Sequence, residues 1–266
     1  MVNFKAQGPY TVDDLREIVS ILRAPGGCPW DGEQTHASIR RDFLEETYEA
    51  VEAIDQGSPE HLKEELGDVL LQVVFHADIE REAGRFTLDD VADGICKKLI
   101  YRHPHVFGNV AVADSNQVLQ NWDALKRREK DQRTHTDAME AVSRTLPALW
   151  RAEKVLKKAE KAGFKWPDIS GAMDKLDQEL GELKEAMVQN SNTEEELGDL
   201  LFAAVNVARF LKADPEAVLN TATDKFIARF ALVEELAREA GRSVEDMDLS
   251  ELEGLWERAK AALKQA

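Results

Sequence analysis

The feature that most constrains this chain is a pattern of four acidic residues that occurs twice. In each copy, two acidic residues three positions apart precede a short break, and a second pair with the same spacing follows it. Side chains three positions apart lie on one face of a helix, about one turn from each other. The first set comprises Glu46, Glu49, Glu65 and Asp68, and the second comprises Glu179, Glu182, Glu196 and Asp199.

The break in each copy contains residues that end one helix and cap the next. They are Gln56-Gly57-Ser58-Pro59 in the first copy and Asn190-Ser191-Asn192 in the second. Each copy is therefore predicted to be a helical hairpin. Glu49 and Glu65 both lie roughly 9 Å from the turn at 1.5 Å per residue, so we expect them side by side on antiparallel helices.

Four carboxylates in one hairpin repel one another unless a cation compensates their charge. A hard divalent cation prefers oxygen ligands; Mg²⁺ suits such a site best, and Mn²⁺ is the alternative ion. The simpler interpretation is a solvated acidic face on a surface helix. The sequence ELGD beside an apolar stripe in both copies, at 65–68 and 196–199, favours the metal site.

Length and composition indicate a globular protein with two domains. The chain has 266 residues, is 43% hydrophobic and carries a formal net charge of -17, which argues against binding to a nucleic-acid polymer or an anionic membrane. Cys28 and Cys96 form no zinc or CxxC pattern and fit a reducing compartment. The sequence shows no signal peptide and no apolar run of membrane-spanning length, so a cytoplasmic location is expected.

Helical periodicity and capping signals predict an all-α fold, and no segment has a strand pattern. Residues 24–31 are predicted as a loop because two prolines and two glycines interrupt the helix there. The charged segment 126–137 lacks an apolar period, and we place the domain boundary in it, giving domains 1–133 and 134–266. Helices are predicted over roughly 11–22, 37–55, 59–83, 87–101, 114–131, 147–162, 170–212 (the second hairpin), 215–240 and 250–264.

The repeat extends to basic and aromatic residues. A tryptophan precedes each hairpin, a Lys/Arg pair four positions apart follows it, and a Trp/Lys pair with the same spacing lies near the end of each half. Solvent-facing charge and core packing explain any one of these residues, but their recurrence in one order favours substrate binding. They are Trp30, Lys98, Arg102, Trp122 and Lys126 in the first half, and Trp166, Lys225, Arg229, Trp256 and Lys260 in the second.

These residue types suit a nucleotide with a polyphosphate chain. Mg²⁺ bridges phosphate oxygens, Lys and Arg neutralise the remaining charge, and an aromatic ring stacks on a base. Water activated by the metal or by a further glutamate attacks phosphorus in line. Glu45, Glu64 and Glu195 are candidates for that glutamate, and the sequence does not choose among them.

In these residues the chain resembles the MazG family of all-α nucleoside triphosphate pyrophosphohydrolases. The resemblance is carried by CPWD at 28–31, LEETYE at 44–49, ELGD at 65–68, RHPHVFG at 102–108 and GFKW at 163–166, and it spans nearly the whole chain. It implies Mg²⁺-dependent hydrolysis of nucleoside triphosphates between the α and β phosphates, which gives the monophosphate and pyrophosphate. It also implies a homodimer whose hairpins complete four-helix bundles, with the principal activity in the C-terminal repeat.

The apolar stripes of the hairpins also call for facing helices, which supports the homodimer. The stripes include Leu66, Val69, Val73, Leu176, Leu180 and Leu183. The two copies differ at Gln178, which stands where the first copy has Glu45, and in the loops before the hairpins, so the two sites need not be equivalent.

Two other functions compete with hydrolysis. One is a non-catalytic helical dimerisation or nucleotide-sensing protein whose acidic stripes are solvated. The other is a carboxylate-bridged di-iron bundle, but the Glu-x-x-His it requires occurs only at Glu33 and His36, outside both stripes. His103 and His105 flank a proline at a helix end, where local packing is the simpler role.

Overall fold

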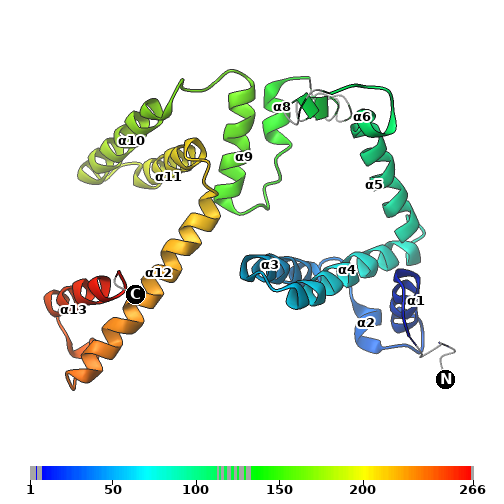
Figure 1. The fold of residues 1–266 in the computed structure, drawn as a ribbon, viewed down its shortest axis with the longest axis horizontal. Coiled ribbons are helices and arrows are strands. Elements are labelled where there is room, and N and C mark those ends of the chain that lie inside the picture. Colours follow the sequence, from blue (N-terminus) through cyan, green and yellow to red (C-terminus); the bar gives the residue numbers. More distant parts are fainter. Residues whose placement is uncertain are drawn as a thin grey trace. The chain divides into compact units, whose positions relative to one another are not determined.

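The computed structural model describes residues 4, 8–112, 114, 117–118, 121–122, 125, 129 and 133–264. In these residues the chain forms helices and no β-strand, which confirms the predicted all-α fold (Figure 1). The chain divides into two compact units, Met1–Lys126 and Arg127–Ala266. The boundary that we placed between residues 133 and 134 stays a prediction.

The first unit is organised around the hairpin of α3 and α4, against which α1 packs. Gly57 ends α3 in the left-handed conformation with φ 65°, and the Ser58 hydroxyl accepts the His61 backbone N–H to start α4. Val19, Ile39, Val74 and Phe75 form the core between these helices. The helices are α1 (Val12–Arg23), α2 (Pro29–Glu33), α3 (Arg40–Gln56), α4 (Pro59–Glu82), α5 (Leu88–Arg102) and α6 (Pro104–Phe107).

The second unit repeats this arrangement with α10 and α11 as the hairpin and α9 packed on α11. Asn190, with φ 50°, takes the left-handed position that Gly57 holds in the first copy. A further core, with Val233, Ala237, Leu255 and Ala259, joins α12 to α13. The helices are α8 (His135–Glu140), α9 (Ala148–Lys161), α10 (Ile169–Gln189), α11 (Thr193–Phe210), α12 (Pro215–Glu239), the 3-10 turn η1 (Val244–Asp246) and α13 (Leu249–Ala262).

Several predicted boundaries were wrong, each for a local reason. The predicted loop 24–31 contains the start of α2, because Pro29 occupies the first helical position, where its missing N–H costs nothing. Pro147 is the N-cap of α9 and not its first residue. The predicted boundary segment contains the start of α8, where Thr134 and Asp137 form a capping box. The helix predicted over 114–131 falls largely outside the described residues.

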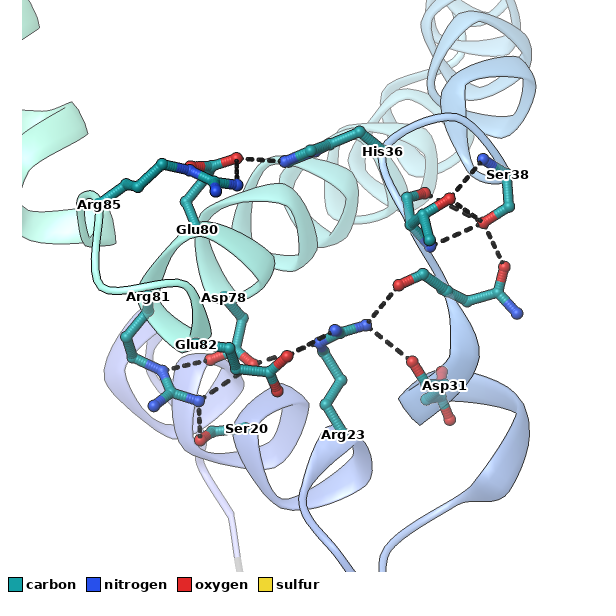
Figure 2. Close-up of polar contacts among 12 residues, drawn as sticks. Ser20, Arg23, Asp31, His36, Ser38, Asp78, Glu80, Arg81, Glu82 and Arg85 are labelled. Atoms are coloured by element: carbon teal, nitrogen blue, oxygen red, sulfur yellow. Dashed lines mark hydrogen bonds and ion pairs between the residues drawn. The ribbon is translucent and has the colours of Figure 1, made fainter.

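Ion pairs fix α1 and α9 against their hairpins, with the charges exchanged between the units. In the first, the buried Arg23 of α1 pairs with Asp78 (3.4 Å) and Glu82 (2.8 Å) of α4 (Figure 2). In the second, Glu160 of α9 pairs with Arg209 of α11. Asp78 and Arg209 both lie ten positions after the aspartate of ELGD. Equivalent positions of the two hairpins therefore form the ion pair with the preceding helix, but with residues of opposite charge.

A second polar cluster in the first unit links the segment before α3 to α4 and its end. The ring of His36 stacks on that of His76, with 2.7 Å between their Nδ1 atoms, and its Nε2 atom contacts Glu80. Arg85 also binds the Glu80 carboxylate, and Figure 2 shows His36 and Arg85 approaching it from opposite sides. These two contacts lower the pKa of Glu80 to about 2, with the Arg85 hydrogen bond as the larger cause.

Large apolar side chains remain exposed on both hairpins and on the helices that follow them. The exposed set includes Leu44, Tyr48, Val51, Leu66, Ile95, Leu99, Leu180, Leu197, Leu201, Leu219, Phe226 and Ile227. None of the helices in the described part of the chain is long and apolar enough to cross a membrane.

Candidate functional site

In the second unit, the hairpin brings three of the four predicted acids together. One carboxylate oxygen from each of Glu179, Glu196 and Asp199 lies within 4.8 Å of the others. Glu179 projects from α10, and the other two project from α11, where the ELGD spacing places them one turn apart.

Glu179 is the most informative member of this cluster because its side chain is withdrawn from water. The residue is only 4% exposed. Its Oε1 atom pairs with the ammonium of Lys175, whereas its Oε2 atom is buried and has no hydrogen-bond partner. A buried carboxylate oxygen without a partner is costly, and a cation ligated there would remove that cost.

The fourth acid, Glu182, lies beside this cluster and is held by a neighbour on its own helix. The Gln178 Nε2 atom donates a 2.7 Å hydrogen bond to Glu182 Oε1, and this bond is the main reason that the pKa of Glu182 is lowered. The pKa of Lys175 is raised, first by its hydrogen bond to Glu179 and further by the charges of Glu182 and Asp199. Three of the four acids, Glu179, Glu182 and Asp199, are therefore close enough to act on one ammonium group.

The first unit assembles an equivalent cluster without a lysine. Carboxylate oxygens of Glu46, Glu49 and Glu65 lie within 4.8 Å of one another, and Asp68 is close enough to raise the pKa of Glu46. Burial is the largest cause of the raised pKa of both Glu46 and Glu49, and repulsion by the neighbouring carboxylates adds to it. Asp42 stands at the position that Lys175 occupies in the second copy.

One polar residue at the start of the second hairpin helix orients the first acid of ELGD in both copies. His61 Nε2 lies 3.0 Å from Glu65, and Asn192 Nδ2 donates a 2.7 Å hydrogen bond to Glu196. Both clusters offer only carboxylate oxygens that are crowded together and partly buried. This donor set fits a hard divalent cation such as Mg²⁺ or Mn²⁺.

A cavity of about 340 Å³ opens next to the second cluster. Glu179, Asp199 and Lys175 line its acidic end, and the remaining wall is largely aromatic and aliphatic, as in small-molecule sites. The other lining residues are Leu156, Phe164, Trp166, Ala172, Phe202, Ala203, Asn206 and Arg209.

The indole of Trp166 depends on a glycine for its position in this wall. A Cβ atom on Gly171 would lie 2.1 Å from Trp166 Cδ1, so any other residue at position 171 would displace the ring. The missing side chain of Gly171, in the first turn of α10, thus leaves room for the Trp166 ring in the cavity wall.

The first unit has core side chains at two of the positions that line this cavity. Seven positions after the aspartate of ELGD stands Phe75 in the first copy and Asn206 in the second. Seven positions before the first acid of each set stand Ile39 and Ala172. Phe75 and Ile39 are both buried in the core of the first unit, so the acids there adjoin packed side chains at these positions.

The predicted substrate-binding residues are distributed over several elements. Trp166 lines the cavity beside the acids. Trp256 packs against the core of α12 and α13, with Phe226 5.0 Å away and the Arg229 guanidinium 5.8 Å from its ring centroid. Lys260 pairs with Glu257 at 2.8 Å, and Lys225 is exposed on α12. The cavity lining itself comes from α9, the loop that follows it, α10 and α11.

In the first unit, the corresponding residues lie on helices around the hairpin. Trp30 is on α2 with 61% of its surface exposed, and Lys98 and Arg102 are on α5. Trp122 is partly exposed. Lys126 lies outside the described residues.

Sequence reasoning missed most residues that line the second site, among them Lys175, Phe202, Asn206 and Arg209. A signal for each was present, because Lys175 is four positions before Glu179, and the others follow Asp199 by three, seven and ten positions on one helix face. They were missed because helix periodicity alone does not distinguish a cavity wall from a core stripe.

Comparison with known proteins places both hairpins in one family. The model of the MazG nucleotide pyrophosphohydrolase domain matches residues 34–107 and again residues 169–247. The chain is 44% identical over 248 residues to the nucleoside triphosphate pyrophosphohydrolase/pyrophosphatase MazG of Thermotoga maritima, covering 93% of this chain and 95% of the relative.

Two further relatives show the same extent of similarity along this chain. The nucleoside triphosphate pyrophosphohydrolase of Escherichia coli strain K12 is 41% identical over 254 residues, with 94% of this chain and 97% of the relative covered. The YabN protein of Bacillus subtilis is 47% identical over 249 residues, which is 92% of this chain but 51% of that longer protein. The similarity thus extends over both units.

Proposed function

This chain belongs to the MazG nucleotide pyrophosphohydrolase family, and we propose that it hydrolyses nucleoside triphosphates between the α and β phosphates, releasing the monophosphate and pyrophosphate. The names of the relatives from Thermotoga maritima and Escherichia coli support the substrate class. One observation of the structure carries the assignment: the buried Glu179 carboxylate, with one oxygen unpartnered, lies at the junction of an acid cluster and an aromatic cavity.

The cavity and the acids suit the two ends of a nucleotide. Trp166, Phe164 and Phe202 offer ring faces and edges against which a base packs. At the other end, the ammonium of Lys175 is positioned to turn from Glu179 to a phosphate oxygen once a cation neutralises the carboxylates.

Glu179, Glu196 and Asp199, with Glu182 beside them, would hold the divalent cation, and we propose Mg²⁺, with Mn²⁺ as a substitute. When bound, such a cation would neutralise phosphate charge and lower the pKa of a nearby water. Glu182 suits a ligand role better than a proton-accepting role, because Gln178 keeps its pKa low. The cluster in the first unit would hold a cation in the same way through Glu46, Glu49, Glu65 and Asp68.

We further propose that the enzyme acts as a cytoplasmic homodimer in which two hairpins complete a four-helix bundle. The exposed apolar side chains of both hairpins and of α12 are the surface that such a bundle would cover. In that assembly Lys225 and Arg229 would reach the phosphates, so Lys225→Ala and Arg229→Ala are expected to weaken nucleotide binding without a loss of melting temperature.

The decisive experiment combines each nucleoside triphosphate with Mg²⁺ and separates the products by chromatography. Pyrophosphate and the monophosphate are expected, and Glu179→Gln or Asp199→Asn should remove at least about 99% of the cleavage because each deletes a cation ligand. Glu194→Gln, an acid on the exposed first turn of α11, is the control and should remain active. Orthophosphate as the first product would refute attack at the α phosphorus, and full activity of Asp199→Asn would refute the metal site.

The same experiment tests the alternative of a non-catalytic dimerisation or sensing protein, which predicts no pyrophosphate. A solvated acidic stripe is a poor description of these clusters, because Glu65 and Glu179 are both buried. The catalytic interpretation explains why they are withdrawn from water beside further carboxylates.

A further inference from the structure

We propose that the amide group of Asn206 selects the base of the substrate, favouring bases that present a carbonyl oxygen, such as hypoxanthine, guanine and uracil, over the amino-bearing adenine and cytosine. The inference rests on the proposed function, since it assigns a role at the far end of the same cavity. The evidence is the buried side chain of Asn206, whose Oδ1 atom accepts two hydrogen bonds while its Nδ2 group donates none within the described residues.

Asn206 lies on α11, two helical turns beyond Asp199, and lines the cavity while being only 4% exposed. Seven residues of helix separate the two positions by roughly 10 Å along the axis. The acids therefore lie toward one end of the cavity and the amide toward the other, as the phosphates and the base edge of one nucleotide require.

The orientation of this amide is fixed by an arginine. Arg209 donates two hydrogen bonds to Asn206 Oδ1, from Nε at 3.1 Å and from an η nitrogen at 3.0 Å. A guanidinium has donors only, so the carbonyl oxygen of the amide must face Arg209, and the Nδ2 group must point away from it.

Arg209 is itself held in place by neighbouring residues, so the orientation of the Asn206 amide is fixed. Its guanidinium pairs with Glu160 of α9 and lies 5.0 Å from the ring centroid of Phe210. Within the described residues, the hydrogen bonds of the Asn206 side chain are made by Oδ1 and not by Nδ2, although the residue is only 4% exposed. The two N–H groups of Nδ2 are therefore available to an acceptor in the cavity, and a bound ligand can supply one.

The first unit has different residues at both of these positions. Phe75 takes the place of Asn206, and Asp78 takes the place of Arg209. Phe75 is buried in the hydrophobic core, and Asp78 pairs with Arg23 and Arg81. The amide and its supporting guanidinium thus occur together beside the cavity of the second copy, and both are replaced in the first copy.

The chemistry of the base edge follows from the donor character of the amide nitrogen. A carbonyl oxygen at the 6-position of a purine or the 4-position of a pyrimidine accepts a hydrogen bond from Nδ2. An amino group at the same position would place donor against donor and leave buried polar groups unpaired, which disfavours the substrate strongly.

Inosine triphosphate and adenosine triphosphate form the sharpest test, because they differ at the 6-position of one purine ring. We expect the kcat/KM of the wild type to favour inosine triphosphate by about tenfold or more. Asn206→Asp removes the donor at nearly constant shape, and the ratio of the two kcat/KM values should fall by about tenfold. Asn206→Leu, which lacks both donor and acceptor, should bring the ratio close to one.

Asn109→Asp makes the same charge change at an exposed position of the first unit and should leave the ratio unchanged. A folded Asn206→Asp or Asn206→Leu enzyme with the wild-type ratio would overturn the base-reading role. A wild type that hydrolyses no triphosphate would instead refute the proposed function.

Discussion

At the scale of single residues, one difference between the copies changes the electrostatics of each acid cluster. Gln178 donates a hydrogen bond to Glu182 and lowers its pKa, whereas Glu45 adds a negative charge that raises the pKa of both Glu46 and Glu49. The amide therefore favours the ionised form of Glu182, whereas Glu45 adds to the effect of burial in making Glu46 and Glu49 harder to ionise.

Exchanging these two residues should exchange the two effects. Gln178→Glu is expected to raise the pKa of Glu182, and Glu45→Gln is expected to lower the pKa of Glu46 and Glu49. The measurement is an NMR titration of the glutamate carboxyl carbons without metal. Unchanged titration curves in both variants would show that the residues at positions 178 and 45 do not set these pKa values.

The ammonium of Lys175 pairs with Glu179, which is a proposed metal ligand. We therefore expect Lys175 to compete with the metal ion for this carboxylate. Lys175→Met should lower the stability of the metal-free protein by about 1–2 kcal/mol, because it leaves the buried Glu179 without its counter-ion. The figure is below that for a fully buried pair, since the Lys175 side chain is 37% exposed.

Added Mg²⁺ should therefore raise the melting temperature of Lys175→Met more than that of the wild type. Lys184→Met, a surface lysine on the same helix, serves as the control. An equal Mg²⁺ response in all three proteins would mean that Lys175 does not compete with the metal.

His76 gives the first unit a predictable sensitivity to acid. Burial and the neighbouring His36 lower the pKa of His76 below its ordinary value of 6.5. The unfolded chain therefore takes up a proton more readily than the folded one, and stability falls as the pH drops below about 6.5 toward the folded pKa. Glu80 affects stability at lower pH. Its pKa is lowered from the ordinary 4.5 to about 2, so the stability that its ionised form contributes is lost as the pH falls from about 4.5 toward 2.

Melting curves between pH 8 and 5 should show this loss in the wild type and less of it in His76→Gln. His135→Gln, at an exposed position of the second unit, should retain the wild-type slope. A steep slope that persists in His76→Gln would assign the acid sensitivity to other groups.

At the scale of elements, the first turn of α10 combines a helix with a support for an aromatic ring. Glycine within a helix costs about 1 kcal/mol relative to alanine, so its presence at position 171 calls for a reason. The reason is the contact with Trp166, since a Cβ atom there would lie 2.1 Å from the indole. The helix gives up some stability so that the cavity wall can form.

Gly171→Ala and Gly181→Ala separate these two effects on one helix. A Cβ atom on Gly181 would meet nothing within 4 Å, so this variant should gain up to about 1 kcal/mol and bind nucleotide normally. Gly171→Ala should displace Trp166 and weaken nucleotide binding by about tenfold, with little loss of stability. Equal affinities of the two variants, measured by calorimetric titration, would show that the position of Trp166 is irrelevant to binding.

At the scale of the whole molecule, the exposed apolar side chains predict a homodimer. Ile227 on α12 is 60% exposed and lies beside the equally prominent Phe226. Ile227→Asp should convert the dimer to a monomer in sedimentation experiments at micromolar concentration, because a charge would be buried at the interface. Arg238→Asp, near the exposed end of the same helix, is the control. A well-folded wild-type monomer at that concentration would contradict the prediction.

The sequence by itself determined the all-α class, the two hairpins and the convergence of acids, because helix periodicity and turn residues act locally. ELGD must place its two acids one turn apart, and Gly57 or Asn190 must turn the chain back wherever the rest of the protein lies. The family resemblance followed from the same short motifs, and the match of the family model within each unit confirms it.

Only the tertiary structure decided that the second acid cluster adjoins a cavity and that core side chains take the equivalent positions of the first. Phe75 and Asn206 occupy the same register of equivalent helices, and periodicity assigns both to an inward face. Such a face either packs into the core or lines a cavity. Which of these occurs depends on the size of the side chains that α1 or α9, and the loop before the hairpin, place against it. Those contacts join residues far apart in sequence, and only the folded chain brings them together.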